Sequence, residues 1–559
     1  MAAGKSTKSA AGKMSRVTSH RLQVTGLTLL SATLLSLAFS SFNLEFLAWF
    51  GFVPLFFVLE KKNRLQSFFI SYFCGFLFFA ASMYWLVYVT IAGWFVLSLY
   101  QALYFGLFGL FFVYFLQPTT YRLPSTIYHL PSTIYIILPS VWVLLEYIRA
   151  NFAGGIGWNL LGYSQYKNLP LIQIADITGV YGVSFLVMLM NVAAYNTIKM
   201  ARKCYTTDSK FKIKGKSFKN DLKANPAIGT LVVLVLFLAT LLYGHYMTTI
   251  YHLPSTISES LKVSIIQGNI PQKIKWDEKY IKYIIERYEG LTLKAAKEKP
   301  HLIIWPETAV PGFLNYDAGL TKWMKTVSVK IKTPILTGAP TISEKNIDDM
   351  YNSAILFSKD GAELGRYDKL HLVLLGEFIP LEKQFPFLRK IFPITGYFIP
   401  GKEYTVFNLP STNYQLPTVA FSVLICFEDI FPGLVRQFVK RGVDFMVNIT
   451  NDAWFGKSCS AYQHAANSVF RAIENRRFFV RSANTGLSCF IDKTGRIYEK
   501  VSKGSQALFV EGIKTAYVDA KPSKNFTFYT KSGDVFVFIC VIILIVSILY
   551  KIYRKVFDN

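Results

Sequence analysis

Seven long apolar segments precede residue 250 in this chain of 559 residues, and an eighth lies near its C-terminus. A helix needs about 20 apolar residues to cross the hydrocarbon core of a bilayer. We therefore predict about eight transmembrane helices, of which the second, fifth and eighth are short. The predicted segments are Leu22–Phe42, Phe46–Leu59, Ser67–Gly93, Trp94–Leu116, Ile134–Ile148, Leu171–Ile198, Ile228–Met247 and Val535–Tyr550.

The distribution of Lys and Arg predicts the orientation of these helices. If the N-terminus is cytoplasmic and the helices alternate in direction, 21 basic residues lie on the cytoplasmic side, nine of them in the 199–226 loop. Only Arg149 and Lys167 then lie in the short outer loops. Such an asymmetry is typical of cytoplasmic loops in membrane proteins. We predict a basic N-terminus (1–21), a seven-helix domain (22–249), an outer domain (250–534) and a C-terminal helix with a cytoplasmic tail (535–559).

The net charge of +26 has other interpretations, which the sequence disfavours. Nucleic-acid binding is not expected, because the basic 199–226 loop matches no known module. A cleaved signal peptide is also disfavoured, since no small-x-small site follows the first apolar segment. The tetrapeptide LPST recurs at irregular spacing, which indicates insertions tolerated in loops. Its copies begin at Leu123, Leu130, Leu253 and Leu409.

The outer domain alternates short apolar runs with amphipathic segments. The runs are rich in Val and Ile and end at Gly, Pro, Asn or Asp, as strands do. Predicted strands cover 262–270, 301–307, 334–340, 351–358, 419–429, 444–452 and 478–486, and predicted helices cover 276–299 and 461–477. This alternation indicates a layered α/β domain.

Three residues that can perform chemistry stand at predicted strand ends: Glu307, Lys369 and Cys426. A thiolate is a strong nucleophile, a carboxylate can accept its proton, and a lysine can stabilise an oxyanion. Each residue taken singly has an ordinary structural interpretation, because an isolated Cys in an apolar strand is usually a buried hydrophobe.

The local sequences around these residues are WPET, YDKLHLVLLGEFIP and LICFEDIFP, in that order. They resemble the Glu–Lys–Cys triad of the nitrilase (carbon–nitrogen hydrolase) superfamily over about residues 262–512. That resemblance implies an α-β-β-α sandwich. A nitrilase-like domain between seven N-terminal spans and one C-terminal span is similar to the apolipoprotein N-acyltransferase family of bacterial inner-membrane enzymes. The segments QGNIPQKIKW, NITNDAWFG, RSANTG and WNLLGYSQY strengthen the likeness.

The resemblance implies a two-step acyl transfer. Glu307 is expected to act as the base, Cys426 as the nucleophile and Lys369 as the oxyanion stabiliser. The donor implied is a phospholipid such as phosphatidylethanolamine, and the acceptor is the α-amine of a diacylglyceryl-modified N-terminal cysteine. Glu377 and Glu428 match supporting acids, with a structural ion pair as the alternative for each.

Five further residues enter through the same resemblance. Phe427 follows the nucleophile where the family commonly has tyrosine, which removes a hydroxyl but keeps an aromatic surface. Trp276 is expected at the substrate entrance, with plain packing as its alternative. Asn451 and Trp454, with Gly456, are expected to shape the loop over the thiol.

No metal or cofactor is expected, since the seven His residues form no ligand-spaced cluster. A disulfide between Cys459 and Cys489 remains open on sequence grounds, and we expect a monomer. Apolar loops near 310–320 and 370–400 are predicted to reach the lipid headgroups, with core contact as the alternative.

Two other functions remain open at this stage. One is a membrane-tethered amidase or nitrilase that uses water as the acceptor. The other is a lipid-binding membrane protein without catalytic activity.

Overall fold

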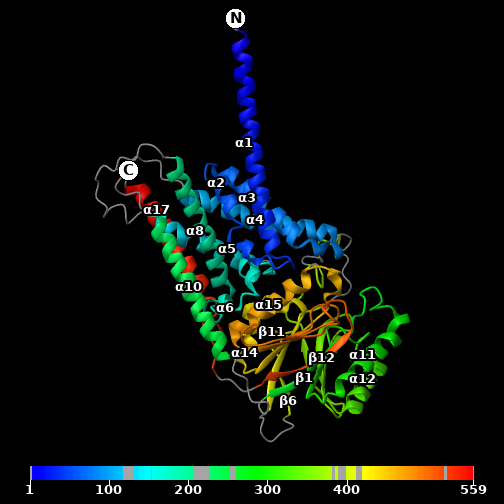
Figure 1. Cartoon of the computed structure of the whole chain (residues 1–559). Coiled ribbons are helices and arrows are strands. Elements are labelled where there is room, and N and C mark those ends of the chain that lie inside the picture. Colours follow the sequence, from blue (N-terminus) through cyan, green and yellow to red (C-terminus); the bar gives the residue numbers. More distant parts are fainter. Residues whose placement is uncertain are drawn as a thin grey trace.

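The structure is a computed structural model, in which a helical bundle lies above a two-sheet sandwich (Figure 1). It describes residues 3–116, 131–152, 154–206, 226–251, 260–374, 376–379, 384–387, 398–410, 418–520 and 525–557. Most of the LPST copies, much of the basic 199–226 loop and much of the 370–400 loop lie outside the described residues.

The bundle contains seven described helices that are long and apolar enough to cross a membrane. They belong to α1 (Ala3–Ala38), α3 (Arg64–Ser82), α4 (Ile91–Leu116), α5 (Pro131–Asn151), α8 (Val180–Thr206), α10 (Pro226–Tyr251) and α17 (Val535–Phe557). On α10 the side chains of Leu231, Leu238 and Leu242 are more than half exposed, which fits contact with lipid.

Three predicted segments differ from the helices observed. The second, 46–59, is a 3-10 turn η1 (Glu45–Trp49) followed by the short helix α2 (Val53–Leu59), where Pro54 opens the helix. The third ends at Ser82 rather than Gly93, and the 3-10 helix η2 (Tyr84–Tyr88) separates it from α4. The sixth begins only at Val180, after the two four-residue helices α6 (Leu169–Ile172) and α7 (Ala175–Thr178).

The short second segment still runs along the bundle beside α8. Asn191 of α8 accepts a hydrogen bond from the Phe52 backbone N–H, and Lys199 at the end of α8 pairs with Glu60 at 2.5 Å. Phe52 and Glu60 are eight residues apart, and so are their partners Asn191 and Lys199. The two segments therefore run parallel. The second and sixth predicted segments therefore run in the same direction, as an alternating arrangement requires.

The outer domain is an α-β-β-α sandwich of two six-stranded sheets, whose orders are β12-β1-β2-β3-β4-β5 and β11-β10-β9-β8-β7-β6. The first contains β1 (Ser260–Gln267), β2 (Leu302–Ile304), β3 (Ile335–Ile342), β4 (Met350–Phe357), β5 (Glu363–Asp368) and β12 (Gly512–Asp519). The second contains β6 (Phe407–Leu409), β7 (Val419–Ile425), β8 (Phe445–Thr450), β9 (Phe478–Ala483), β10 (Cys489–Ile491) and β11 (Ile497–Lys500). All seven predicted strands are present. The short strands β5, β6, β10 and β11 and the final strand β12 were not predicted.

Alternating side chains of each strand build the two sides of the first sheet. Leu302 and Ile304 of β2 join the core between the sheets, whereas Ile303 packs under α11 (Ile281–Ala296) and α12 (Ala318–Ile331). Strands β1, β2 and β3 are parallel, as are β7, β8 and β9. The carboxyl ends of β2 and β7 carry Glu307 and Cys426, which places both residues at one end of the sandwich.

The outer helix of the second sheet also docks on the membrane bundle. Helix α15 (Ser460–Asn475) is buried on all sides except at Tyr462, because it lies between that sheet and the bundle. Gln463 donates to the carbonyl oxygens of Phe39 and Ser82 and accepts from the indoles of Trp85 and Trp158. These contacts join two regions that are more than 300 residues apart in sequence.

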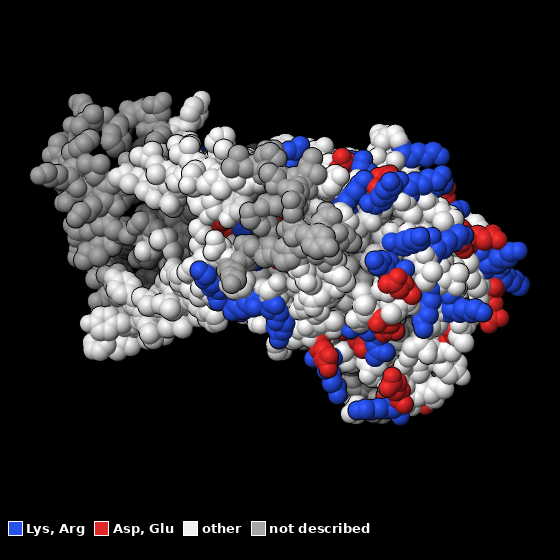
Figure 2. Space-filling view, turned by 90° about the horizontal axis from the view of Figure 1, so that it is seen from below, with Lys and Arg blue, Asp and Glu red and all other residues white. Residues whose placement is uncertain are grey.

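Charged side chains gather on the sandwich rather than on the bundle. Figure 2 shows Lys and Arg interspersed with Asp and Glu over the sandwich, while the described bundle surface in that view is almost free of charge. An uncharged belt is what contact with lipid requires.

Candidate active site

Cys426 occupies a sharp turn between β7 and the 3-10 helix η7 (Cys426–Ile430). Its φ of 56° is left-handed, a conformation that is uncommon for residues other than glycine. The carbonyl oxygen of Cys426 accepts hydrogen bonds from Asn448 Nδ2 at 2.8 Å and His464 Nε2 at 3.2 Å. Surrounding side chains thus hold the strained turn in place.

Glu307 follows β2 and is 7% exposed. Its Oε1 accepts a hydrogen bond from Asn352 Nδ2 at 2.8 Å, and its backbone carbonyl accepts one from Lys275 Nζ at 3.0 Å. Gly338 of β3 lets this loop approach closely, since a Cβ there would lie 2.7 Å from the Glu307 Cα. The carboxylate is therefore fixed from both its side chain and its backbone.

Lys369 follows β5 and is almost fully buried. Its Nζ lies 2.9 Å from Glu377 Oε1 and 3.9 Å from Glu307 Oε1. Asn352 donates to Glu377 as well as to Glu307, so one amide spans the two acids. The ammonium also lies 5.5 Å from the ring centre of Phe427. The aromatic surface expected at Phe427 thus contacts the lysine.

The electrostatics of the site favour a protonated thiol at rest. Burial, with the Glu307 carboxylate second, raises the pKa of Cys426 well above its usual value, and Lys369 opposes this shift. Burial lowers the pKa of Lys369, but Glu377 and Glu307 outweigh burial and raise it. The lysine is therefore charged, and the thiol needs a base to become a nucleophile.

Glu428 connects the lysine loop to the cysteine turn. Its carboxylate accepts hydrogen bonds from the backbone N–H groups of Ile425, Leu370 and His371 and from the Tyr367 hydroxyl. Burial raises the pKa of Glu428 to about 7, despite these bonds. The carboxylate of Glu428 therefore ties the lysine loop to the cysteine turn through hydrogen bonds.

The three predicted substrate-binding residues lie in different environments. Trp276 is 47% exposed, while its neighbour Lys275 points inward to Glu307. Trp454 is 37% exposed, in the 3-10 helix η8 (Asp452–Phe455). Asn451 is buried and hydrogen-bonded to Gln272 and Asn484, so it fixes the base of this loop.

Sequence reasoning missed two residues that touch the triad, Asn352 and Lys275. Asn352 opens a predicted strand, where a polar residue is unremarkable. Lys275 stands beside Trp276 in a segment that resembles the family. The available signal was that one residue of this neighbouring pair points inward. Burial lowers the pKa of Lys275 to about 8, although the charges of Glu307 and Cys426 oppose this shift.

Two other expectations change with the structure. In the 310–320 loop, Val310, Leu314 and Leu320 are buried in the core beneath the first sheet's helices, whereas Tyr316 between them is 67% exposed. The loop therefore combines core contacts with an exposed tip, and its contact with lipid headgroups stays a prediction. Cys459 and Cys489 are both free cysteines. In the part of the chain that the structure describes, no three His, Cys, Asp or Glu side chains are grouped to hold a metal ion.

The loops that carry the triad face the membrane bundle. Leu374, five residues after Lys369, lies next to Gly154, and Phe431, five residues after Cys426, packs against Gly155. Phe455 of η8 contacts Trp85 of η2 edge-on, with ring centres 4.6 Å apart. The site therefore lies at the bundle-facing end of the sandwich.

Comparisons with known proteins agree with this division of the chain. Residues 31–193 match the family described as apolipoprotein N-acyltransferase N-terminal domain, and residues 262–522 match carbon-nitrogen hydrolase. An apolipoprotein N-acyltransferase of Geobacter metallireducens is 36% identical, with 92% of each chain covered. One from Chlorobaculum tepidum is 30% identical, covering 95% of this chain and 96% of the relative.

Among solved structures, Nit3 of Saccharomyces cerevisiae, from branch 10 of the nitrilase superfamily, aligns with a TM-score of 0.36 and 17% identity. The alignment covers 50% of this chain and 97% of Nit3.

Proposed function

The chain belongs to the apolipoprotein N-acyltransferase family, and from this premise we propose that it moves an acyl chain from a phospholipid, through a thioester on Cys426, to the α-amine of an N-terminal diacylglyceryl-cysteine. The observation that carries the proposal is the convergence of Glu307, Lys369 and Cys426 at the sandwich end that faces the bundle. A site in that position suits substrates held in a bilayer.

The first half of the reaction forms the thioester. Glu307 removes the proton of the Cys426 thiol, and the sulfur attacks the ester carbonyl of the phospholipid. The carbon–oxygen bond of that ester then breaks, and the lysophospholipid oxygen takes the proton from Glu307. The raised pKa of Cys426 supports a mechanism in which the base acts during attack.

The second half forms the amide. The α-amine attacks the thioester, Glu307 accepts a proton from the nitrogen, and the carbon–sulfur bond breaks. The proton returns to the sulfur, which restores the thiol. An activated acyl intermediate divides one difficult transfer into two easier ones.

Lys369 is suited to stabilise the oxyanion of both steps, because it is charged, buried and held by Glu377. The Phe427 N–H is suited to be a second donor, since the first N–H groups of a helix have no partner within it. Preorganised donors of this kind account for much of the rate enhancement in acyl transfer.

The proposal places the protein in a bacterial inner membrane, with the sandwich in the periplasm and both termini in the cytoplasm. The C-terminal end of α17 lies at the bundle end away from the sandwich (Figure 1). Lys551 in its last turns and Arg64 both lie over the Tyr114 ring, and this gathering of basic residues supports the orientation. Reporter fusions near residues 210 and 350 are expected to report cytoplasm and periplasm respectively, and the reverse pattern would contradict the orientation.

The deciding experiment is mass spectrometry of the purified protein after incubation with phosphatidylethanolamine. We expect one acyl chain on Cys426 and release of lysophospholipid, followed by transfer of the chain to an added diacylglyceryl lipopeptide. Cys426→Ala should abolish both steps, whereas Cys459→Ala, at another half-buried cysteine, should retain them.

Other outcomes identify the two rival functions. Release of free fatty acid without a lipopeptide product would indicate a hydrolase that uses water. An absent adduct, together with unchanged behaviour of Cys426→Ala, would indicate a lipid-binding protein without catalysis.

A further inference from the structure

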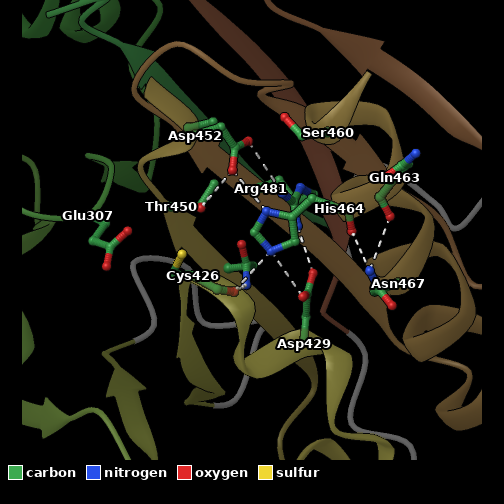
Figure 3. A network of polar contacts seen from close by, with 12 residues as sticks. Glu307, Cys426, Asp429, Thr450, Asp452, Ser460, Gln463, His464, Asn467 and Arg481 are labelled. Atoms are coloured by element: carbon green, nitrogen blue, oxygen red, sulfur yellow. Dashed lines mark hydrogen bonds and ion pairs between the residues drawn. The ribbon is translucent and has the colours of Figure 1, made fainter. Parts of the chain in front are cut away.

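A buried polar network lies directly beneath the nucleophile, centred on His464 of α15 (Figure 3). The Nδ1 of His464 lies 2.9 Å from Asp452 Oδ1. Its Nε2 lies 3.2 Å from the Cys426 carbonyl oxygen and 3.2 Å from Asp429 Oδ1. Arg481 of β9 pairs with Asp429 at 2.7 Å.

Hydrogen-bond accounting fixes the charge of this histidine. Both ring nitrogens face oxygens of carboxylates or a carbonyl, and these groups can only accept when the acids are ionised. Arg481 and Ser468 both donate to Asp429, which keeps that acid ionised. His464 therefore carries two protons, and two cations balance two anions in the buried network.

The pKa directions agree with this assignment. Burial lowers the pKa of His464, but Asp429 and Asp452 outweigh burial and raise it to about 9. The same contacts lower the pKa of both acids against the effect of burial. The imidazolium therefore persists at neutral pH.

The contact between His464 and Cys426 acts on the peptide bond that follows the nucleophile. A trans peptide places its C=O and N–H on opposite sides. Holding the Cys426 carbonyl from below with His464 and Asn448 therefore directs the Phe427 N–H the opposite way, toward the side where an oxyanion would form. The positive charge also balances Asp452, whose carboxylate raises the pKa of Cys426.

Gln463, the residue before His464, is hydrogen-bonded to the membrane bundle. The Nε2 of Gln463 donates to two bundle carbonyl oxygens, and its Oε1 accepts from two bundle indoles. The Trp158 ring also lies against His464, with ring centres 5.4 Å apart. Trp158 is held in turn, because its carbonyl accepts from Arg149 of α5 at 2.7 Å.

We propose that His464 is a positioning residue, a buried imidazolium that holds the Cys426 turn, and that Gln463 and Trp158 couple its position to the membrane bundle. The inference rests on the proposed acyl transfer for its meaning, but Cys426 can be examined without that reaction. The membrane bundle then serves as part of the frame that orients the nucleophile, in addition to anchoring the domain.

The test uses the full-length protein in detergent and the variants His464→Gln and His464→Ala. Alkylation of Cys426 by iodoacetamide is followed against pH by mass spectrometry of the Cys426 peptide. We expect the alkylation midpoint to move upward by about one pH unit. Without His464, Arg481 is left as the single cation of the network beside the two carboxylates Asp429 and Asp452. The acyl-enzyme should form about 30-fold more slowly, with the KM for phospholipid changed less than about twofold.

Charge rescue separates positioning by charge from general damage. The double variant His464→Gln/Asp452→Asn again balances the network, since Asp429 and Arg481 remain, and should return the midpoint toward that of the parent protein. The groups that face His464 and bear on this titration are Asp429 of η7, Asp452 of η8 and Arg481 of β9, while Glu307 and Lys369 face Cys426 across the site. His301→Gln, on the other side of the domain, is the matched control and should leave the midpoint unchanged.

The membrane link is tested separately by Trp158→Phe, which removes one donor to Gln463 but keeps His464. We expect acyl-enzyme formation to slow about fivefold, whereas Trp94→Phe, which loses a comparable indole bond to Ala80, should have no effect. Equal behaviour of the two tryptophan variants would overturn the coupling. An unchanged alkylation midpoint in both His464 variants would overturn the positioning role, even if the parent protein proved to use another acyl donor.

Discussion

The two sheets of the sandwich contribute differently to the site. The sheet that contains β1 to β5 supplies the carboxylates and the lysine, and its outer helices α11 and α12 face away from the bundle (Figure 1). The other sheet supplies Cys426, and its outer helix α15 is clamped against the bundle. In the proposed mechanism, separate halves of one domain therefore carry proton transfer and the position of the nucleophile.

The largest expected effect tests the proton-handling half. Glu307→Gln removes the base but keeps a group that can accept from Asn352. We expect acyl-enzyme formation to fall by at least about 10³-fold, because general base catalysis contributes about 10²- to 10⁴-fold. The rate of acyl adduct formation measures this. Glu286→Gln, at an exposed position of α11, is the control, and equal rates in the two variants would remove Glu307 from the mechanism.

The second effect tests the clamped half through stability. Asp176 of α7 pairs with Arg476, just after α15, at 2.6 Å, and both are buried. Asp176→Asn leaves a buried guanidinium without its counter-charge, so we expect a loss of about 3 kcal/mol. Thermal unfolding in detergent measures the change.

The matched variant lies on the other sheet. Glu511→Gln removes the partner of Arg287 at a half-exposed position, where a lost pair should cost at most about 1 kcal/mol. If the two variants unfold at the same temperature, the second sheet is not specially tied to the bundle.

The third effect concerns a residue that acts inside the first sheet. Asn352→Ala deletes the amide that donates to both Glu307 and Glu377. Two charge-assisted hydrogen bonds are lost, so acyl-enzyme formation should slow about 30-fold, equivalent to about 2 kcal/mol. Asn346→Ala, in an exposed turn, provides the comparison. A change in KM alone would instead assign Asn352 to substrate binding.

The sequence predicted most of what local patterns encode. Strand-end positions and flanking motifs identified Glu307, Lys369 and Cys426, and hydropathy identified the apolar segments, since both signals are contiguous in the chain. The ends of the helices were less predictable: the break at Tyr84–Tyr88 and the late start of α8 depend on where loops dock onto the sandwich.

The residues that the sequence did not reveal act across long distances. Asn352 matters because it reaches two acids on different loops, and His464 because folding brings α15 beneath a turn 38 residues away. A histidine in an amphipathic helix carries no local signal of its charge. Only the carboxylates placed around it by η7 and η8 determine that charge.

The smallest expected effect concerns Lys275, the buried lysine that donates to the Glu307 backbone carbonyl. Its folded-state pKa is about 8, below the usual value of 10.5, because burial disfavours the ammonium. Between those values the unfolded chain binds a proton that the folded protein does not. The free energy of unfolding therefore rises with pH in this range, and this contribution is lost as the pH falls through 8. The slope approaches about 1.4 kcal/mol per pH unit. Thermal unfolding of Lys275→Met and of the parent protein, compared at pH 8 and 9.5, should show a steeper rise in the parent. Other titrating groups cancel in the difference, and parallel curves would show that Lys275 is not a depressed, buried amine.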